Sequence, residues 1–356
     1  MSDKKSGKPQ VNRRGFLKLG SAAAAGLLTR VLPAQAGLMP PPAHALPLLP
    51  SNPATATSMP LRNLGRTGYR VGIMSLGGQA AIEQPNNEAV AVAIIERALD
   101  LGVNYIDTAS LYGGRQRWSQ RYIGQVMKRR RSETFLTSKT YDRTRDGSLR
   151  LLEESLRLLQ TDHLDLWQIH SLDRMDEVEK IFAPDGAVKA LVEAREQKMV
   201  RFLGVTGHST PDVLVEAIRR FPFDTILLAL NAADKHHRSF SEHLLPLAVE
   251  KQMGIIGMKV PARGRILSTW TPPPFEQQRK WEIGTRPGTI TMREAVHYVL
   301  SLPVGTIIIG CDSVAQLEEN IQLGRTFAPL SQEQMAELVA RTEPISRQAL
   351  FFRHLS

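Results

Sequence analysis

The sequence predicts an α/β fold, a single (β/α)8 TIM barrel that follows a removable amino-terminal segment and a linker. Short apolar runs alternate with helical patterns along most of the 356 residues, the order expected of a parallel sheet with helices around it. Eight such runs are present, the number of strands in this barrel. No run is followed by the glycine-rich phosphate motifs of nucleotide-binding open sheets. A doubly wound open sheet is the structural alternative.

The strands are expected where apolar residues cluster between turn signals. The eight runs are 70–76, 103–106, 135–138, 164–169, 201–205, 225–230, 254–258 and 306–309. Helical periodicity fills the intervals, for instance over 88–101, 148–159 and 211–220. The first of these helices is expected to stop at Gly102, because glycine favours the left-handed conformation that ends a helix.

The first 36 residues carry the features of an export signal. Arg13 and Arg14 precede Phe16-Leu17-Lys18, a short weakly apolar run follows, and Ala34-Gln35-Ala36 offers a cleavage site. The pattern resembles a twin-arginine signal, which implies contact with the twin-arginine export machinery and a periplasmic location. A Sec-type signal and a disordered basic tail are the alternatives.

Residues 37–58 are rich in Pro, Ala and Ser, a composition typical of an extended linker. Ala43-His44-Ala45 offers a second cleavage site within it. The folded barrel is therefore expected over residues 59–356.

Composition limits the classes of function. Apolar residues make up 42% and charged residues 22%, which is ordinary for a globular protein and excludes a wholly disordered chain. The net charge is +10, but the first 36 residues alone hold seven basic residues and one acid. Nucleic-acid binding therefore loses its main support, and the basic stretch 128–131 is interpreted as a solvated helix end. The lone Cys311 forms neither an intramolecular disulfide nor a Cys-cluster metal site.

Four polar residues stand at or just beyond successive predicted strand ends. Asp107 ends the second strand, Tyr112 follows five residues later, Lys139 ends the third strand and His170 ends the fourth. Each residue alone has an ordinary structural explanation, such as a helix cap or a buried histidine. In a barrel, however, all of these strand ends open into one mouth, where active sites lie. We therefore expect the four side chains to form a catalytic group.

Their chemistry suits proton transfer to a carbonyl oxygen that receives hydride. The pKa of a free tyrosine, near 10, is too high for ready proton donation at neutral pH, so the Lys139 ammonium is expected to lower the pKa of Tyr112. Asp107 would hold the lysine, and His170 would orient the substrate oxygen. No side chain supplies hydride, so a cofactor is required.

Several stretches between about Leu61 and Leu323 follow a known pattern: 64–68, 102–109, 112–113, 137–139, 165–170, 308–310 and 317–320. In these stretches the sequence resembles the aldo-keto reductase family. The resemblance implies Asp107, Tyr112, Lys139 and His170 as the catalytic tetrad, with Tyr112 as general acid. It also implies NADP(H) or NAD(H) extended across the barrel mouth and a small carbonyl or alcohol substrate.

Eight further residues are predicted to bind the cofactor, and the resemblance places its adenosine phosphate end around 310–320. They are Gly77, Thr206, Asn231, Lys259, Gly310, Ser313, Gln316 and Asn320. Thr206-Gly207-His208 replaces the Ser-Asn that relatives often carry after the fifth strand, and His208 could instead cap the following helix. Gln316 stands where a basic residue is common and Asp312 lies nearby, which weakens the case for a 2′-phosphate.

Two other functions remain open on the sequence alone. One is a cofactor-binding regulatory or partner barrel without turnover; the other is internal redox chemistry, such as dismutation or epimerisation, on a retained cofactor. The intact tetrad favours a reductase or dehydrogenase. Residues 262–287, with Trp270 and Trp281, are the expected substrate loop, and no metal site is expected.

Overall fold

The computed structural model describes residues 45–278 and 282–353, and the predicted signal segment lies outside them. Eight parallel strands close into a barrel in the order β10-β3-β4-β5-β6-β7-β8-β9, so the predicted (β/α)8 fold is confirmed. The strands are β3 (Met74–Gly77), β4 (Tyr105–Asp107), β5 (Phe135–Thr140), β6 (Leu164–Ile169), β7 (Val200–Gly207), β8 (Thr225–Ala229), β9 (Gly254–Met258) and β10 (Thr306–Ile309).

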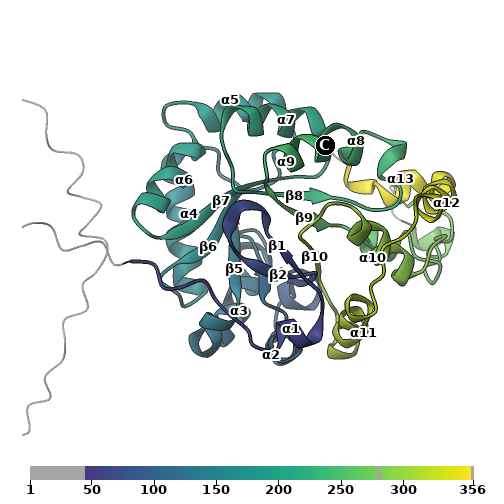
Figure 1. Ribbon diagram of the computed structural model, residues 1–356, viewed down its shortest axis with the longest axis horizontal. Helices are drawn as coiled ribbons and strands as arrows, with labels where there is room; N and C mark the ends of the chain where they lie inside the picture. The colour runs from purple at the N-terminus through teal and green to yellow at the C-terminus, as the bar shows by residue number, and fades with distance from the viewer. Residues whose placement is uncertain (1–44, 279–281, 354–356) are drawn as a thin grey trace, which may run out of the picture. The chain divides into compact units, whose positions relative to one another are not determined.

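The first predicted strand is in fact two strands with different partners. β2 (Arg70–Gly72) pairs antiparallel with β1 (Leu61–Asn63), and only β3 belongs to the barrel. The turn of this hairpin meets the loop before β9, where Arg66 donates to the carbonyl oxygen of Lys251 at 2.8 Å. The hairpin therefore lies at the amino-terminal end of the barrel strands, the end in front in Figure 1.

Aromatic side chains fill the amino-terminal part of the barrel. The ring of Phe135 stacks on those of Tyr105 and Phe202, with centroids 5.5 and 5.9 Å apart. Tyr69 of the hairpin packs on Phe135 at 4.6 Å. This layer closes the end of the barrel opposite to the strand ends that carry the tetrad, so the barrel is a packed core with one open mouth.

Helices surround the barrel (Figure 1). They are α2 (Glu88–Asp100), α3 (Trp118–Arg130), α4 (Arg145–Leu158), α5 (Met175–Phe182), α6 (Ala187–Glu196), α7 (Pro211–Arg220), α8 (Phe240–His243), α9 (Leu245–Glu250), α10 (Met292–Ser301), α11 (Val314–Arg325) and α12 (Gln332–Thr342). The basic stretch ends α3, where Arg130 pairs with Glu96 and Glu133 at 2.9 and 2.7 Å. The described part of the segment between β9 and α10 is irregular apart from two short 3-10 turns.

Part of the expected linker belongs to the folded unit, which corrects the predicted boundary at residue 59. The buried side chain of Asn52 donates to the carbonyl oxygens of Leu99 and Val103 at 2.7 and 3.2 Å. A short helix, α1 (Thr55–Ser58), follows and buries Thr55 and Ser58. Asn52 packs because it satisfies backbone groups at the end of α2, a pairing that a Pro- and Ala-rich composition does not reveal.

The carboxyl-terminal segment is anchored by a buried ion pair. It comprises α13 (Ser346–Ala349) and the 3-10 turn η10 (Phe351–Arg353), which lie beside α8 in Figure 1. Arg353 pairs with Asp234, and both side chains are fully buried. The guanidinium also donates to the carbonyl oxygens of Ala229 and His237. The segment is thereby fixed at the end of β8, on the side of the mouth.

No helix within residues 45–278 and 282–353 has the length and apolarity needed to cross a membrane.

Candidate active site

Strand register brings three of the predicted catalytic residues together. Asp107 lies opposite Thr137 in the β4–β5 pairing, and Lys139 lies opposite Gln168 in the β5–β6 pairing. Because side chains alternate between the two faces of a strand, Asp107 and Lys139 share the interior face with the aromatic layer below them. His170 directly follows β6, two residues after the interior Gln168.

A buried ion pair forms the centre of this group. The Lys139 ammonium donates to Asp107 Oδ2 at 2.5 Å and to the carbonyl oxygen of Thr108 at 2.9 Å. Thr137 donates to the second oxygen of Asp107 at 3.0 Å. Both charged side chains are 1% exposed. The bonds to Asp107 and to the Thr108 carbonyl hold the Lys139 ammonium in one position. Its positive charge is therefore directed at a fixed neighbouring group.

The Tyr112 hydroxyl is that neighbour. Its oxygen lies 3.5 Å from Lys139 Nζ, and the ammonium is 5.0 Å from the centre of the phenol ring. The loop that carries Tyr112 turns at Gly113, which has a φ of 83°. A Cβ at this position would lie 2.5 Å from the backbone nitrogen of Trp118. Glycine is therefore required for the turn that presents the phenol.

The pKa of Tyr112 is opposite in direction to the prediction. Burial, with the negative charges of Asp107 and Glu83, raises the pKa of Tyr112 well above 10. The positive charge of Arg263 acts in the opposite direction but does not reverse the shift, and Glu83 was not foreseen as a neighbour. Tyr112 is thus protonated at neutral pH, the state that a proton donor needs.

His170 completes the group as a neutral imidazole. Its ring centre is 5.9 Å from that of Tyr112, at an interplanar angle of 80°. Burial, with the positive charge of Lys139 next in importance, lowers the pKa of His170 well below 6.5. Among the described residues, its Nδ1 has no hydrogen-bond partner. No hydrogen bond from a described residue therefore fixes the ring proton of His170 at Nδ1, and the tautomer with the proton on Nε2 is available.

The residues predicted for the cofactor phosphates lie along the β3, β9 and β10 ends of the barrel. Gly77 ends β3, and a Cβ there would lie 3.1 Å from the backbone nitrogen of Gly310. Lys259 directly follows β9, and its ammonium donates to Gln79 Oε1 at 3.2 Å. A Cβ on Gly310 would lie 3.2 Å from the carbonyl oxygen of Gln79. The structure thus brings Gly77, Gly310 and Lys259 together around Gln79.

The other three residues predicted at the adenosine end lie at the start of α11 and along it. Ser313 caps this helix by accepting from the backbone nitrogen of Gln316 at 3.2 Å. The exposed side chain of Gln316 accepts from the backbone nitrogen of Asp312 at 2.6 Å. Asn320 is buried and donates to Cys311 Sγ at 3.4 Å. The exposed first turn of α11 can therefore meet an anion, whereas Asn320 holds the loop before it.

Thr206 and Asn231 have structural partners that the sequence did not suggest. The fully buried Thr206 hydroxyl accepts from the backbone nitrogen of Ser171 at 2.8 Å. The fully buried Asn231 amide accepts from Ala233 N at 2.9 Å and donates to the carbonyl oxygen of Ala349 at 3.0 Å. Their polar atoms therefore hold the loops of the mouth, and their predicted contact with the cofactor stays a prediction.

Several residues at the mouth were missed or misread. His208 does not cap α7, because its ring nitrogen Nδ1 lies 2.8 Å from Ser171 Oγ. Phe352 packs edge-on against His208 with centroids 6.5 Å apart. The place of His208 at the mouth could have been predicted, because it follows the end of the fifth strand. Phe352 had no such signal, since the carboxyl-terminal segment reaches the mouth only through tertiary contacts.

The expected substrate loop is partly described. Its first turn contains Arg263, whose guanidinium lies 5.8 Å from the centre of the Phe351 ring. Trp270 is half-buried near Gly264, and Trp281 lies outside the described residues. Within residues 45–278 and 282–353, no three His, Cys, Asp or Glu side chains are grouped to hold a metal ion.

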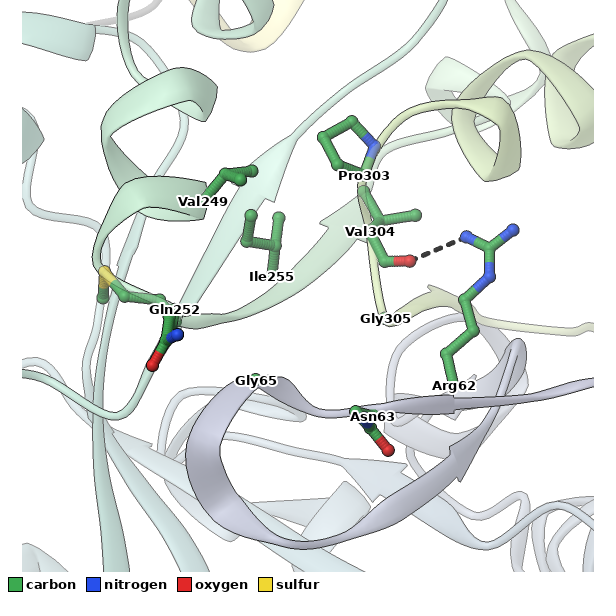
Figure 2. Close-up of a pocket in the computed structure, with 10 residues that line it drawn as sticks. Arg62, Asn63, Gly65, Val249, Gln252, Ile255, Pro303, Val304 and Gly305 are labelled. Atoms are coloured by element: carbon green, nitrogen blue, oxygen red, sulfur yellow. Dashed lines mark hydrogen bonds between the residues drawn. The ribbon is translucent and has the colours of Figure 1, made fainter.

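A pocket also lies at the opposite, amino-terminal end of the barrel (Figure 2). It is lined by residues of the hairpin and of the loops before β9 and β10. Arg62, at its edge, donates to the carbonyl oxygens of Val304 and Leu300 at 2.7 and 2.8 Å. A guanidinium used in this way closes the barrel end, so this pocket is assigned a structural role.

Comparison with known proteins agrees with this geometry. Residues 70–343 match the aldo/keto reductase family. The chain is 25% identical over 316 residues to the uncharacterized oxidoreductase YqkF of Bacillus subtilis, covering 79% of this chain and 96% of YqkF. It is 25% identical over 315 residues to L-galactose dehydrogenase of Arabidopsis thaliana, covering 81% and 96%.

Solved structures share the fold. The holo form of the aldo-keto reductase AKR11C1 from Bacillus halodurans superposes with a TM-score of 0.63 at 24% identity, covering 79% of this chain and 96% of that one. The family match spans most of the chain, and the structure supplies the barrel on which that family is built. The protein therefore belongs to the aldo/keto reductase family and is an NAD(P)-dependent oxidoreductase.

Proposed function

We propose that the protein reduces an aldehyde or ketone, or oxidises the corresponding alcohol, with Tyr112 as the general acid. The observation that carries this proposal is the position of the Lys139 ammonium, 2.5 Å from Asp107 Oδ2 and 3.5 Å from the Tyr112 hydroxyl. A buried cation held by a carboxylate beside a protonated phenol is suited to proton donation.

The residues divide the work as follows. The nicotinamide cofactor supplies hydride when bound. Tyr112 gives its hydroxyl proton to the substrate oxygen, and the Lys139 ammonium stabilises the phenolate that this leaves. His170, neutral and with its Nδ1 unpartnered among the described residues, donates from Nε2 to the same oxygen and orients it.

The residues at the β3, β9 and β10 ends fit a dinucleotide. Among the residues that the structure describes, Lys259 bonds to Gln79 alone, so its cation is available to a phosphate. Gly310 leaves room beside Gln79 that a side chain would fill. The exposed amino-terminal turn of α11, capped by Ser313, presents the positive end of the helix to a second anionic group. We propose Lys259, Gly310, Ser313 and Gln316 as the residues that hold NADP(H) or NAD(H).

The direct test of this proposal is stoichiometric turnover. Purified protein with NADPH or NADH and a panel of aldehydes and ketones should consume one equivalent of reduced cofactor per carbonyl reduced. A protein that binds either dinucleotide but turns over no carbonyl would instead be a binding or regulatory barrel. Retention of the dinucleotide through purification, detected by native mass spectrometry, would indicate internal redox on a bound cofactor.

Cofactor affinity is expected to fall as the pH rises through about 8. Burial, with the positive charges of Arg263 and Lys139, lowers the pKa of Lys259 from 10.5 to about 8. Above this pH the amine loses its proton, and the phosphates lose their cation. The dissociation constant should then rise by up to about tenfold per pH unit until the pKa of the bound state is reached. Fluorescence titration on both sides of the pKa measures this.

Lys259→Met should remove this pH dependence, and the exposed Lys189→Met is the matched control that should retain it. An equal slope in wild type and Lys259→Met would assign the titration to another group.

The preference for NADP(H) over NAD(H) is expected to be weaker than about a hundredfold, because position 316 is a glutamine and not an arginine. Gln316→Arg should shift the ratio of dissociation constants toward NADP(H) by about ten- to a hundredfold, through a charge-assisted contact with the 2′-phosphate. Gln322→Arg, on the last turns of the same helix, is the control. A wild-type preference above about a thousandfold would mean that another basic residue binds the phosphate.

We also propose that the protein is exported by the twin-arginine route. Replacing Arg13 and Arg14 together by lysine should leave folded precursor in the cytoplasm, because the export machinery reads the arginine pair. Cell fractionation measures this, and Lys4→Arg with Lys5→Arg is the charge-matched control. Undiminished export of the first double variant would indicate a Sec route.

A further inference from the structure

Three side chains beside the tetrad form a hydrogen-bonded chain that the proposed mechanism does not use. Asp173 Oδ2 accepts from the Ser171 hydroxyl at 2.6 Å, and Ser171 Oγ lies 2.8 Å from His208 Nδ1. Asp173 Oδ1 accepts from the backbone nitrogens of His208 and Ser209 at 2.9 and 3.0 Å. One carboxylate thus holds both the loop that carries His208 and the hydroxyl that meets its ring.

The direction of these bonds fixes the tautomer of His208. Although burial raises the pKa of Asp173, the hydrogen bonds from Ser171 and the loop outweigh it, so that the pKa lies below 3.8. The carboxylate is therefore ionised and can only accept. Ser171 has a single hydroxyl proton, which it gives to Asp173, and its oxygen must accept from His208. His208 Nδ1 consequently carries the ring proton, and Nε2 carries a lone pair.

The ring that carries this nitrogen lies next to His170 of the tetrad. The ring of His208 is 6.5 Å from that of His170 and 6.5 Å from that of Phe352, centre to centre. Within the described part of the chain, Nε2 of His208 makes no hydrogen bond. Burial, with the positive charges of Lys259 and Lys139, lowers the pKa of His208 to about 3, so the ring stays neutral. Its Nε2 can therefore receive a hydrogen bond but cannot give one.

We propose that His208 Nε2 accepts a hydrogen bond from a hydroxyl group carried by the substrate close to its carbonyl. The two histidine rings are adjacent, and a short hydroxylated carbon chain spans them with its carbonyl oxygen at His170 and its hydroxyl at His208. The substrate class is accordingly an aldehyde or ketone with a neighbouring hydroxyl. This inference rests on the proposed carbonyl reduction and adds the group that selects the substrate.

Selection for hydroxylated substrates follows from the free-energy cost of leaving His208 Nε2 without a hydrogen bond. A compound with a methyl group in place of the hydroxyl would set an apolar group against Nε2 and leave it without a hydrogen bond, and a carboxylate there would face a lone pair. The amide of the nicotinamide is the other donor that could reach a nitrogen acceptor in this mouth. The two sources share one chemistry, and cofactor affinity distinguishes them.

The test compares isosteric pairs of carbonyl compounds that differ by one hydroxyl. Lactaldehyde is paired with isobutyraldehyde, and hydroxyacetone with butanone. In wild type, kcat/KM should be at least about tenfold higher for the hydroxylated member of each pair. His208→Leu should lower this ratio at least about tenfold, while the dissociation constant of the cofactor stays unchanged. His243→Leu, an exposed histidine on α8, is the control and should keep the wild-type ratio.

Asp173→Asn tests the tautomer without changing side-chain size. The amide would donate to Ser171, Ser171 would donate to His208 Nδ1, and the ring proton would move to Nε2. The ratio should fall as in His208→Leu, whereas a merely structural role would lower kcat/KM for both members of a pair alike and leave the ratio unchanged.

The outcomes are distinct. Turnover with no preference within either pair, or a ratio unaffected by His208→Leu, would overturn this inference and leave the proposed reductase intact. A higher cofactor dissociation constant in His208→Leu with an unchanged ratio would also overturn it and assign the acceptor to the nicotinamide amide. No turnover of any carbonyl compound by wild type would remove both proposals.

Discussion

Replacing Tyr112 by phenylalanine is expected to lower kcat for carbonyl reduction by about 10²- to 10⁴-fold, while cofactor affinity changes little. The ring and its packing remain, and only the hydroxyl 3.5 Å from the Lys139 ammonium is removed. The pKa of Tyr112 lies well above 10, so wild type holds the proton until the chemical step. The loss should therefore appear in that step and not in binding.

Single-turnover kinetics and a fluorescence titration of the cofactor measure these two quantities. Tyr122→Phe is the matched control, because its hydroxyl lies on α3 and donates to the carbonyl oxygen of Gln84 at 3.2 Å, outside the barrel. Retention of more than about a tenth of the wild-type kcat in Tyr112→Phe would reject Tyr112 as the general acid.

Removing the carboxylate of Asp234 is expected to give the largest loss of stability. Asp234→Ala leaves the fully buried Arg353 charged and unpaired, a change that costs about 3–5 kcal/mol. The same carboxylate accepts from the Ser239 hydroxyl at 2.8 Å and from the backbone nitrogen of Ser241 at 2.9 Å. The variant therefore also loses the contacts that begin α8.

The free energy of unfolding from urea denaturation measures this effect. Asp212→Ala, an exposed acid in the first turn of α7, is the control and should change stability by less than about 1 kcal/mol. A similarly small effect of Asp234→Ala would show that Arg353 finds other partners or water. Activity measured below the unfolding transition should fall as well, because the anchored segment carries Phe352.

The barrel strands could be predicted because they are buried on both faces. The runs 164–169, 254–258 and 306–309 coincide with β6, β9 and β10, since a continuous apolar stretch between turn signals has few other uses. The run 70–76 misled because its apolar character continues through Ile73, whereas the chain leaves the hairpin there and enters the barrel.

The site was predictable where it depends on the barrel and not where it depends on distant partners. Because Asp107, Lys139 and His170 end successive barrel strands, their proximity could be predicted from the sequence. The pKa of Tyr112 was not predictable, because it depends on burial and on Glu83, which stands on another loop. The role of Asn231 was hidden for a similar reason, since its partner Ala349 is 118 residues away in the chain.

The anchored carboxyl-terminal segment has a consequence for biosynthesis. Arg353 binds at the end of β8, and Phe352 beside it reaches His208, so this wall of the mouth forms only after the segment that carries both residues has been synthesised and has docked. A nascent chain can form all eight strands and still lack a finished substrate site. A stop codon that removes Phe352 and Arg353 should therefore impair catalysis in protein that still folds as a barrel.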